Sequence, residues 1–548
     1  MGKINILETT DSRIDTSPSF RYSNLRFHLI AVILTLLGLL CRLPYLKLGL
    51  WRDEGSTYFN IIPTTFEDIL ARISYTELNP PAFYIVLKQW ILAIGMDDIL
   101  FKLPSLIFGL LLIPAMYFLG QSIGSRKAGI ISAFIATFHY EAIYYSQEAR
   151  PYTLSMLLCC LTLIAYISII DNNRNALKNI LFLSLSCSLF FYVQYTGFIL
   201  VIALGMTTII LSLFKKVEKQ TAWLTLSSFL LALLLFIPWI NNFIVHFRTG
   251  LPWQEKANFL ARIIGVPYNI FRYTTTYLTT HTLFQFLCVF VIFVFTLKEV
   301  FNSLKYLQID DPAQDTLQKR KFTIFTIFVL VISALTILDY RDKYILPFCP
   351  IAWCIYGLWL DNLFEQIRAH TQTSKKLYTA LSLTACVMMI TICFSSLANV
   401  AKLSNTPKSG IASMAQEMNE EELSSSFFIL VPDFLSPTFG YYFQDTPATF
   451  RGFGRWKSPE IFSPRQYAEI WNSDMLLENF LSNLQLEANE NFDYIYLIKL
   501  DQQLYNQGKM KYSKVNDVLR ELQQRYKLID STTYKGLEES VIAYKFAN

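Results

Sequence analysis

Long apolar runs recur along the chain and stop near residue 398. Most approach the 20 or so residues that an α-helix needs to cross the hydrocarbon core of a bilayer. A shorter run, 80–95, contains Lys88, so we expect a helix that lies in the membrane interface there. The pattern predicts eleven spans, which are residues 27–46, 102–121, 128–146, 151–170, 177–195, 197–214, 221–240, 281–300, 322–338, 344–363 and 376–397.

The charges of the loops predict how these spans are oriented. Lys and Arg gather in alternate connections, such as Arg126–Lys127 and Lys319–Arg320–Lys321, and basic loops favour the cytoplasmic side. They share one side only if 80–95 does not cross, which predicts a cytoplasmic N-terminus and an outer C-terminus. The first run is too long for the apolar core of a signal peptide and lacks a small-residue cleavage site, so we expect it to stay in the membrane.

The sequence changes character after residue 398, where apolar runs become short. Their length and their β-branched and aromatic content predict strands, and an amphipathic pattern predicts a helix beside them. About 150 residues suffice for one α/β domain. The predicted strands are 427–434, 492–500 and 540–546, and the predicted helices are 464–487 and 516–529.

The expected fold class is therefore a polytopic α-helical membrane protein with a C-terminal α/β domain outside the membrane. The predicted parts are a cytoplasmic tail (1–26), a transmembrane domain (27–398) whose first outer loop is 47–101, and an extracytoplasmic domain (399–548).

Composition supports the membrane assignment. Apolar residues make up 53% of the 548 residues and charged residues 16%, against about 25% charged in a typical soluble domain. These values exclude a disordered or fibrous chain. The net charge of +5 is sorted by side and forms no nucleic-acid patch. The nine cysteines lie in or beside apolar runs without a CxxC pair, so neither a zinc site nor a disulfide framework is indicated.

The strongest candidate for chemistry is the pair Asp53–Glu54, just beyond the first predicted span. Trp51 and Tyr58 flank it, and such a partly apolar setting can tune a carboxylate for work as a general base. The alternative is a solvated loop charge.

Two outer turns carry cations that could bind a phosphate. Arg150 follows Glu148 in a turn between two spans, and its planar guanidinium suits a phosphate. The alternative is an ion pair between Arg150 and Glu148. Arg341 and Lys343 lie in the turn 339–344, where the alternative is that they anchor the chain at the interface.

Weaker candidates complete the set. Asn79 precedes two prolines in a rigid turn, and Glu141, near the outer end of a span, could line a cavity. Asp53, Glu54 and Glu148 could share a divalent cation, although no ligand spacing requires one.

These residues stand in the order and spacing of a known family. The sequence resembles the bacterial GT-C glycosyltransferases that use polyprenyl-phosphate sugars, the group of protein O-mannosyltransferase-like and aminoarabinose-transferase-like proteins. The resemblance covers about residues 27–400. The matching segments are WRDEGSTYF (51–59), NPPAFYIVLKQWILAIG (79–95), FKLPSLIFGLLLIPAMYFLG (101–120), SRKAGIISAFIA (125–136), YYSQEARPYTLSML (144–157), FIPWI (236–240) and KYILPFCP (343–350).

The resemblance implies a site as well as a fold. It implies that Asp53 is the catalytic base, with Glu54 beside it, and that Arg150 touches the lipid phosphate. Lys343 stands where the family usually has Arg, again near the phosphate, and Tyr152 and Tyr344 are expected to line the site. The chain departs from the family at Asn79, where His or Lys is common.

The sequence therefore predicts a glycosyltransferase in the bacterial inner membrane. A carboxylate would deprotonate an acceptor, and cations would stabilise the leaving phosphate, which suggests a single displacement with inversion. The sugar, a hexose or a pentose, and the acceptor, a protein, lipid or polysaccharide, stay open. The alternatives are a transporter or flippase and a non-catalytic scaffold for glycan assembly.

Overall fold

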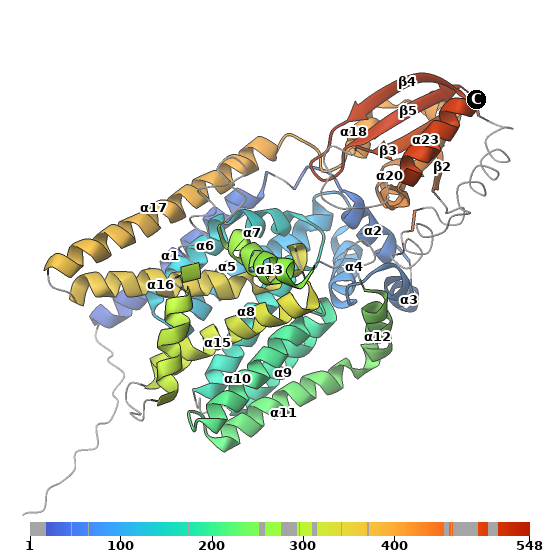
Figure 1. Cartoon of the computed structure of the whole chain (residues 1–548). Coiled ribbons are helices and arrows are strands. Elements are labelled where there is room, and N and C mark those ends of the chain that lie inside the picture. The colour runs from blue at the N-terminus through green and yellow to red at the C-terminus, as the bar shows by residue number, and fades with distance from the viewer. Residues whose placement is uncertain are drawn as a thin grey trace, which may run out of the picture.

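A computed structural model gives the fold of the chain (Figure 1). It describes residues 18–547 except positions 45, 64, 172–175, 251–257, 276–292, 295, 309–314, 341, 370–371, 454–459, 462, 464–491 and 502–512.

The described residues before position 404 form helices joined by turns and irregular segments. Their bounds are α1 Pro18–Arg42, α2 Arg52–Ile61, α3 Phe66–Thr76, α4 Ala82–Ile94, η1 Leu100–Lys102, α5 Leu103–Ile123, α6 Arg126–Phe138, α7 Tyr140–Tyr144, η2 Tyr145–Gln147, α8 Tyr152–Ile170, α9 Ala176–Val193, α10 Gly197–Leu213, α11 Lys219–Phe236, η3 Ile237–Trp239, α12 Ile240–Thr249, α13 Phe259–Thr275, η4 Lys305–Gln308, α15 Asp315–Leu338, η6 Asp342–Tyr344, η7 Leu346–Phe348, α16 Cys349–Ala369 and α17 Gln372–Leu403.

Five helical segments in the described residues are long and apolar enough to cross a bilayer. They are Leu25–Arg42, Leu100–Ile123, Tyr152–Ile170, Lys219–Thr249 and Thr316–Leu338. Shorter apolar helices, among them Leu177–Val193 and Gly197–Leu213, lie between them. The polytopic helical fold is thus confirmed, whereas the count of eleven spans stays a prediction, because most of 281–300 lies outside the described residues.

One predicted span is not a single helix. Residues 128–146 do not form one helix, because α6 ends at Phe138 and α7 begins at Tyr140. His139 between them is extended, with φ −69° and ψ 132°, and its Nδ1 accepts a hydrogen bond from the backbone N–H of Glu141 at 3.3 Å. His139 therefore caps α7, and apolar content alone did not reveal this polar break.

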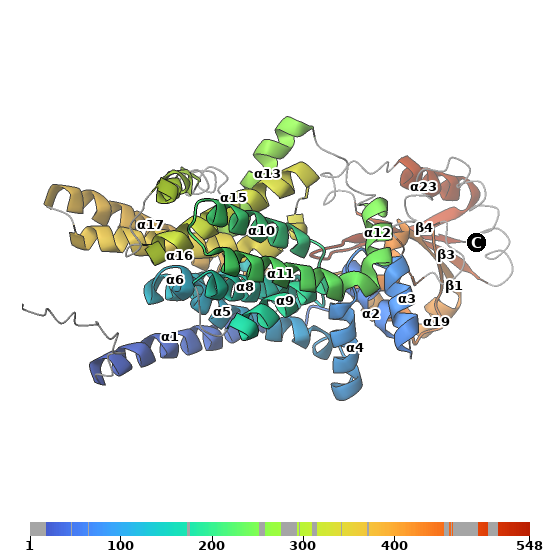
Figure 2. The same cartoon turned by 90° about the horizontal axis from the view of Figure 1, so that it is seen from below.

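The helix over the interrupted run, α4, has its own direction. It spans Ala82–Ile94, and in both Figure 1 and Figure 2 it runs across the long axes of α8, α9 and α11. At 13 residues it is shorter than a typical spanning helix. Its place in the membrane interface stays a prediction.

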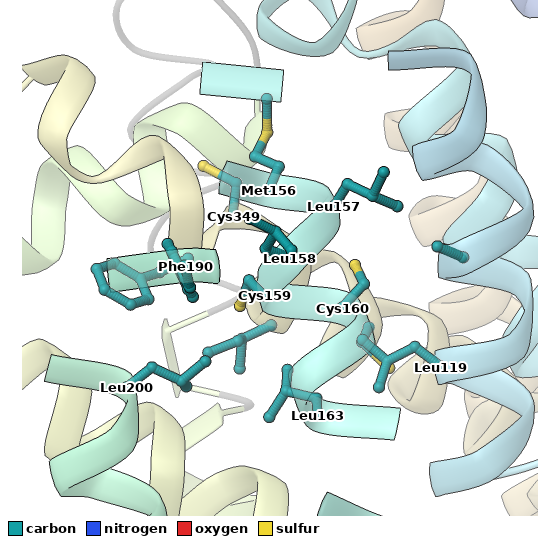
Figure 3. Close-up of a cluster of buried hydrophobic side chains, with 14 of the residues drawn as sticks. Leu119, Met156, Leu157, Leu158, Cys159, Cys160, Leu163, Phe190, Leu200 and Cys349 are labelled. Carbon is teal, nitrogen blue, oxygen red and sulfur yellow. The ribbon is translucent and has the colours of Figure 1, made fainter. Parts of the chain in front are cut away.

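The helices pack around an apolar core centred on α8 (Figure 3). Cys159 and Cys160 are fully buried there beside Met156 and Leu163, in the role of small hydrophobes that the sequence predicts. Elsewhere α5 and α6 approach so closely that a Cβ on Gly120 would lie 2.8 Å from the Cα of Gly129. Small residues at such a contact let two helix backbones meet.

A mixed sheet domain follows α17 and lies at one end of the helical bundle (Figure 1). The strand order is β2-β1-β3-β5-β4; β1 pairs in parallel with β2 and β3, and β5 is antiparallel to β3 and β4. The bounds are α18 Gly410–Glu417, α19 Glu420–Ser424, β1 Ser426–Val431, η8 Asp433–Leu435, α20 Ser436–Phe443, β2 Thr449–Gly452, β3 Tyr494–Leu500, α23 Ser513–Arg525, β4 Lys527–Tyr534 and β5 Val541–Ala547.

The predicted C-terminal α/β fold is confirmed, with two strands added. The helix predicted over 516–529 ends at Arg525, and the next residues begin β4, whose mostly exposed and polar sequence hid it. The short edge strand β2 was also missed. The predicted helix 464–487 lies outside the described residues.

Candidate functional site

The short helix α2 presents the predicted catalytic pair. Its N-cap, Trp51, is extended, and Asp53 and Glu54 occupy the first helical turn. Carboxylates are favoured there because the unpaired backbone N–H groups give the N-terminus of a helix a partial positive charge. The two neighbouring side chains then leave the helix in different directions and meet different partners.

Asp53 forms an ion pair with Lys343, a predicted phosphate ligand that lies 290 positions later in the sequence. Its Oδ2 accepts a hydrogen bond from Lys343 Nζ, and the two side chains keep 16% and 28% of their surface exposed. Lys343 Nζ also lies 5.7 Å and 5.8 Å from the ring centres of Trp51 and Tyr152. The predicted base and a predicted phosphate ligand thus share one partly open site.

The electrostatics of this site keep Asp53 ionised. Burial raises the pKa of Asp53, but the positive charges of Lys343, Arg150 and Arg52 together outweigh it and hold that pKa below its usual range. Arg52 Nε lies 3.5 Å from Asp53 Oδ1. Asp53 is therefore a weak base while these cations surround it, and it becomes a stronger base when one of them leaves.

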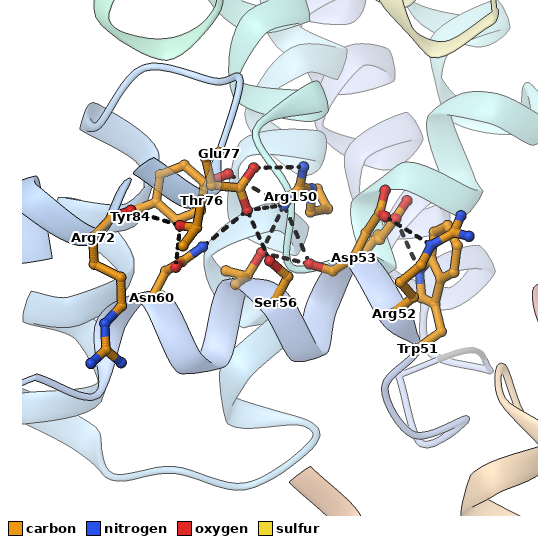
Figure 4. A network of polar contacts seen from close by, with 12 residues as sticks. Trp51, Arg52, Asp53, Ser56, Asn60, Arg72, Thr76, Glu77, Tyr84 and Arg150 are labelled. Atoms are coloured by element: carbon orange, nitrogen blue, oxygen red, sulfur yellow. Dashed lines mark hydrogen bonds and ion pairs between the residues drawn. The ribbon is translucent and has the colours of Figure 1, made fainter. Parts of the chain in front are cut away.

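Arg150 makes a two-pronged ion pair, with a partner that sequence reasoning missed. Its Nη1 and Nη2 donate to the two carboxylate oxygens of Glu77 at 3.0 Å and 3.3 Å (Figure 4). The alternative pair between Arg150 and Glu148 is not what the structure shows. Asn60 Nδ2 donates at 3.1 Å to Glu77 Oε1, the oxygen that also accepts from Arg150 Nη1. Because Asn60 belongs to α2, the Glu77 carboxylate contacts α2 as well.

Arg150 also fixes the backbone that carries Asp53. Its Nη1 lies 3.3 Å from the carbonyl oxygen of Asp53 and 3.0 Å from Thr57 Oγ1, both on α2. The hydroxyl of Tyr84 lies 3.2 Å from the same nitrogen and is hydrogen-bonded to Asn79. Asn79 therefore adjoins the Arg150 network through Tyr84.

Glu54 has a different environment from Asp53. Its Oε2 lies 2.8 Å from Lys408 Nζ, its Oε1 accepts from the backbone N–H of Ala149 at 2.8 Å, and both charged side chains are at most 1% exposed. Lys408 belongs to the segment that joins α17 to α18, and its ammonium also donates to the carbonyl of Gln147 at 2.9 Å. Glu54 thus links α2 to two other parts of the chain.

Glu148 is a buried carboxyl between these two ion pairs. Trp51 Nε1 donates to its Oε1 at 3.1 Å, whereas its Oε2 has no hydrogen-bond partner among the described residues. Burial and the negative charges of Glu54 and Asp53 raise the pKa of Glu148 to about 8, against the opposing charges of Lys408 and Lys343. Glu148 therefore holds its proton more tightly than a solvent-exposed glutamate does.

The remaining predicted residues fall in several places. Tyr344, next to Lys343, packs against Tyr340 with the two ring centres 5.7 Å apart and the ring planes tilted by 46°. Glu141 is buried in the first turn of α7. Arg341 lies outside the described residues.

The shared divalent cation considered for Asp53, Glu54 and Glu148 does not fit these contacts. Asp53 and Glu54 are each neutralised by a lysine, and both oxygens of Glu54 are occupied. Among the residues that the structure describes, no group of three or more His, Cys, Asp or Glu side chains is placed to hold a metal ion.

The C-terminal domain packs directly on α2. A Cβ on Gly55 would lie 2.9 Å from the backbone of Pro437 in α20, so only glycine allows this contact. Tyr442 OH bonds to the backbone N–H and carbonyl of Leu50, at 2.7 Å and 3.1 Å. The Arg52 guanidinium lies 4.5 Å from the ring centre of Phe434. The domain thus borders the site of Asp53.

Sequence reasoning therefore missed three charged residues of this site: Glu77, Lys408 and Arg52. Glu77 carried a usable signal, since it stands two residues before Asn79 in a predicted outer loop. Lys408 carried none, because nothing local to it indicates a partner 354 positions earlier.

Comparisons with known proteins identify the fold of the chain. Residues 79–241 match the family model described as dolichyl-phosphate-mannose-protein mannosyltransferase. Solved GT-C structures superpose on most of the chain. The chain has the GT-C fold. The resemblance predicted from the sequence is thereby confirmed.

Three of the solved structures illustrate the likeness. Archaeal oligosaccharyltransferase AglB from Archaeoglobus fulgidus, in complex with an inhibitory peptide and a dolichol-phosphate, is 12% identical with a TM-score of 0.57, over 88% of this chain and 70% of that chain. ArnT from Cupriavidus metallidurans in the apo state is 10% identical with a TM-score of 0.52, over 96% and 98%. ArnT bound to undecaprenyl phosphate is 9% identical with a TM-score of 0.50, over 95% and 98%. No curated protein sequence matches the chain significantly.

Proposed function

We propose that this protein transfers a sugar from a polyprenyl-phosphate donor to an acceptor on the outer face of the bacterial inner membrane. The observation that carries the proposal is the Asp53–Lys343 pair, a carboxylate and an ammonium in contact and both partly exposed. The family match and two fold neighbours solved with undecaprenyl phosphate or dolichol-phosphate support the donor class.

In the proposed reaction Lys343 exchanges partners. The donor phosphate takes the ammonium of Lys343 away from Asp53, and this frees the carboxylate and raises its pKa towards that of a useful base. Asp53 then removes the proton of the acceptor O–H or N–H as the acceptor atom attacks the anomeric carbon. The bond from that carbon to the phosphate oxygen breaks, and its electron pair stays on the lipid phosphate.

The charge that develops during the proposed reaction explains why Lys343 and Asp53 have different roles. Negative charge builds on the leaving phosphate, where a preplaced cation stabilises the transition state. Attack opposite the leaving group inverts the anomeric carbon and needs only one carboxylate, because a phosphate leaves without a protonating acid. Arg150, already paired with Glu77, positions α2, and a direct contact of Arg150 with phosphate stays a prediction.

The test is transfer from defined donors. The purified full chain is incubated with polyprenyl-phosphate hexoses and pentoses carrying a radiolabelled sugar, and sugar release or transfer is counted. We expect Asp53→Asn to lower turnover by at least about 100-fold while the protein stays folded. Glu67→Gln, at an exposed acid of α3, is the matched control and should retain it. Unchanged turnover in Asp53→Asn would overturn the assignment of the base.

A further inference from the structure

A cavity lies at the opposite end of the helical bundle from Asp53. It has a volume of about 390 Å³, within the range of about 300–1,000 Å³ that is usual for small-molecule sites. It opens among the start of α1, the turn between α5 and α6, α15 and α16. In Figure 2 the C-terminal domain lies at the right and the first turns of α1 at the left, near this cavity.

One wall of the cavity is suited to a phosphate. Ser125 caps α6 and accepts hydrogen bonds from the backbone N–H groups of Lys127 and Ala128 at 3.1 Å and 3.3 Å, so these N–H groups are already satisfied and a phosphate here would be held by basic side chains. The side chains of Arg126, Lys127 and Lys321 line the cavity, and Lys127 forms an ion pair with Glu365 at 2.9 Å. Lys321 Nζ donates to Asn362 Oδ1 at 3.1 Å, which leaves this ammonium further N–H donors.

Next to the Ser125 cap lies a carboxylate with an unused oxygen. Asp361 is 8% exposed, and its Oδ2 accepts from Ser125 Oγ at 2.5 Å. Its Oδ1 is buried and has no hydrogen-bond partner among the described residues. A buried carboxylate oxygen without a donor is unfavourable, so a ligand that brings N–H groups would be stabilised here.

The rest of the lining is apolar and continues into the membrane-facing surface. Phe27, Leu317 and Leu358 complete the cavity wall. Beyond Phe27, α1 leaves Leu29, Val32 and Leu36 exposed along a spanning helix. Acyl chains can follow this surface, which a water-soluble ligand would not use.

We propose that this cavity binds the headgroup of a phospholipid that carries a phosphate and a primary amine, as phosphatidylethanolamine does. The phosphate lies at the start of α6 beside Lys321, and the ammonium donates to Asp361 Oδ1. The Lys and Arg residues of the loops at this end predict that the lipid comes from the cytoplasmic leaflet, where basic pockets between helices bind lipid headgroups. The site is separate from the proposed transfer site.

Lipid retention measured by native mass spectrometry tests this proposal. The delipidated full chain is incubated with micelles of equal parts phosphatidylethanolamine, phosphatidylcholine and phosphatidylglycerol. We expect about tenfold preferential retention of phosphatidylethanolamine, because the trimethylated amine of phosphatidylcholine has no N–H to donate. Asp361→Asn should remove this preference, and Lys321→Gln should lower the retention of all three lipids.

Matched variants keep the test decisive. Lys319→Gln, at a lysine of α15 that pairs with Asp171 outside the cavity, should retain the lipid. Leu317→Trp, at a half-exposed position of the wall, should block the cavity without disturbing buried charges.

Three results would each contradict the proposal. The first is equal retention of the ethanolamine and choline lipids. The second is retention in well-folded Leu317→Trp as in the unmodified chain. The third is displacement of the lipid by an equal concentration of soluble phosphoethanolamine, since the ligand would then be a soluble phosphate ester.

Discussion

Asp53 and Glu54 are neighbours in sequence, and each contacts one lysine, yet the two ion pairs differ in almost every other respect. The Asp53–Lys343 pair keeps 16% and 28% of its side-chain surface exposed, whereas the Glu54–Lys408 pair keeps 0% and 1%. Both carboxylates lie in the first turn of α2, so helix position cannot explain the difference. The difference comes from what packs around each pair.

The exposed pair is the one that can change partners. Lys343 belongs to a short turn between α15 and α16. A change in the conformation of its side chain alone would move its ammonium away from Asp53. The buried pair cannot exchange without leaving a charge unpaired away from water, which costs several kcal/mol. We therefore assign chemistry to Asp53 and the anchoring of α2 against the C-terminal domain to Glu54.

The largest effect should come from Asp53→Asn. The amide keeps the shape of the side chain but cannot accept the acceptor's proton, so we expect turnover to fall by about 100- to 10,000-fold. The melting temperature should fall less than when the buried Glu54–Lys408 pair is broken, because the Asp53–Lys343 pair is partly open to water. Rates with radiolabelled donor and thermal unfolding of the same samples check this. A large loss of stability with normal turnover would reverse the two roles.

Breaking the buried pair should affect folding instead. Lys408→Met leaves Glu54 charged and unpaired at a fully buried site, which is expected to destabilise the protein by about 3–5 kcal/mol. The double variant Glu54→Gln with Lys408→Met should regain much of this, because no unpaired charge remains. Lys402→Met, at an exposed lysine of α17, is the control. Thermal unfolding measures all three, and equal melting temperatures would contradict an anchoring role.

The difference between the two carboxylates also shows which parts of the site could be predicted from the sequence. Long apolar runs predicted the helical bundle, and the motif around Asp53 together with the turn 339–344 predicted the open half of the site, Asp53 and Lys343. Local patterns carry such information because they report burial and turn position. They could not predict that Lys408, from the connection to the C-terminal domain, would neutralise Glu54, since that contact depends on how two domains pack.

The same limit explains the missed break before α7 and the missed partner of Arg150. The helix predicted over 128–146 breaks at His139 because a side-chain cap competes with apolar content. Arg150 seemed free to bind an anion because its partner, Glu77, is 73 positions away in sequence. A pattern can show that a buried guanidinium needs an anion, but the tertiary fold selects the anion.

A smaller effect is expected when the exposed pair loses its cation. Lys343→Gln should raise the donor KM by about 10- to 100-fold, as loss of a hydrogen bond to a charged group implies. Without this ammonium the pKa of Asp53 rises, because burial is then less opposed. The acidic limb of the rate profile should therefore move to higher pH.

Lys47→Gln, at an exposed lysine of the first outer loop, controls for a general loss of positive charge and should leave both values unchanged. An acidic limb at the same pH in Lys343→Gln and the unmodified chain would show that Lys343 does not tune Asp53.

The smallest effect concerns Glu148, which lies between the two pairs and accepts from Trp51. Its pKa is raised from 4.5 to about 8 in the folded protein, so the folded state binds the proton more tightly than the unfolded state. The stability this provides is complete below pH 4.5 and is lost as the pH rises to about 8.

Glu148→Gln, which keeps an oxygen for Trp51 but does not titrate, should lose less stability than the unmodified chain between pH 6 and 8. We expect a difference of roughly 2–4 °C in melting temperature, since Lys343 and Lys408 offset part of the cost. Parallel melting curves across this range would show that Glu148 is ionised beside both lysines, and the two ion pairs would then be one coupled network.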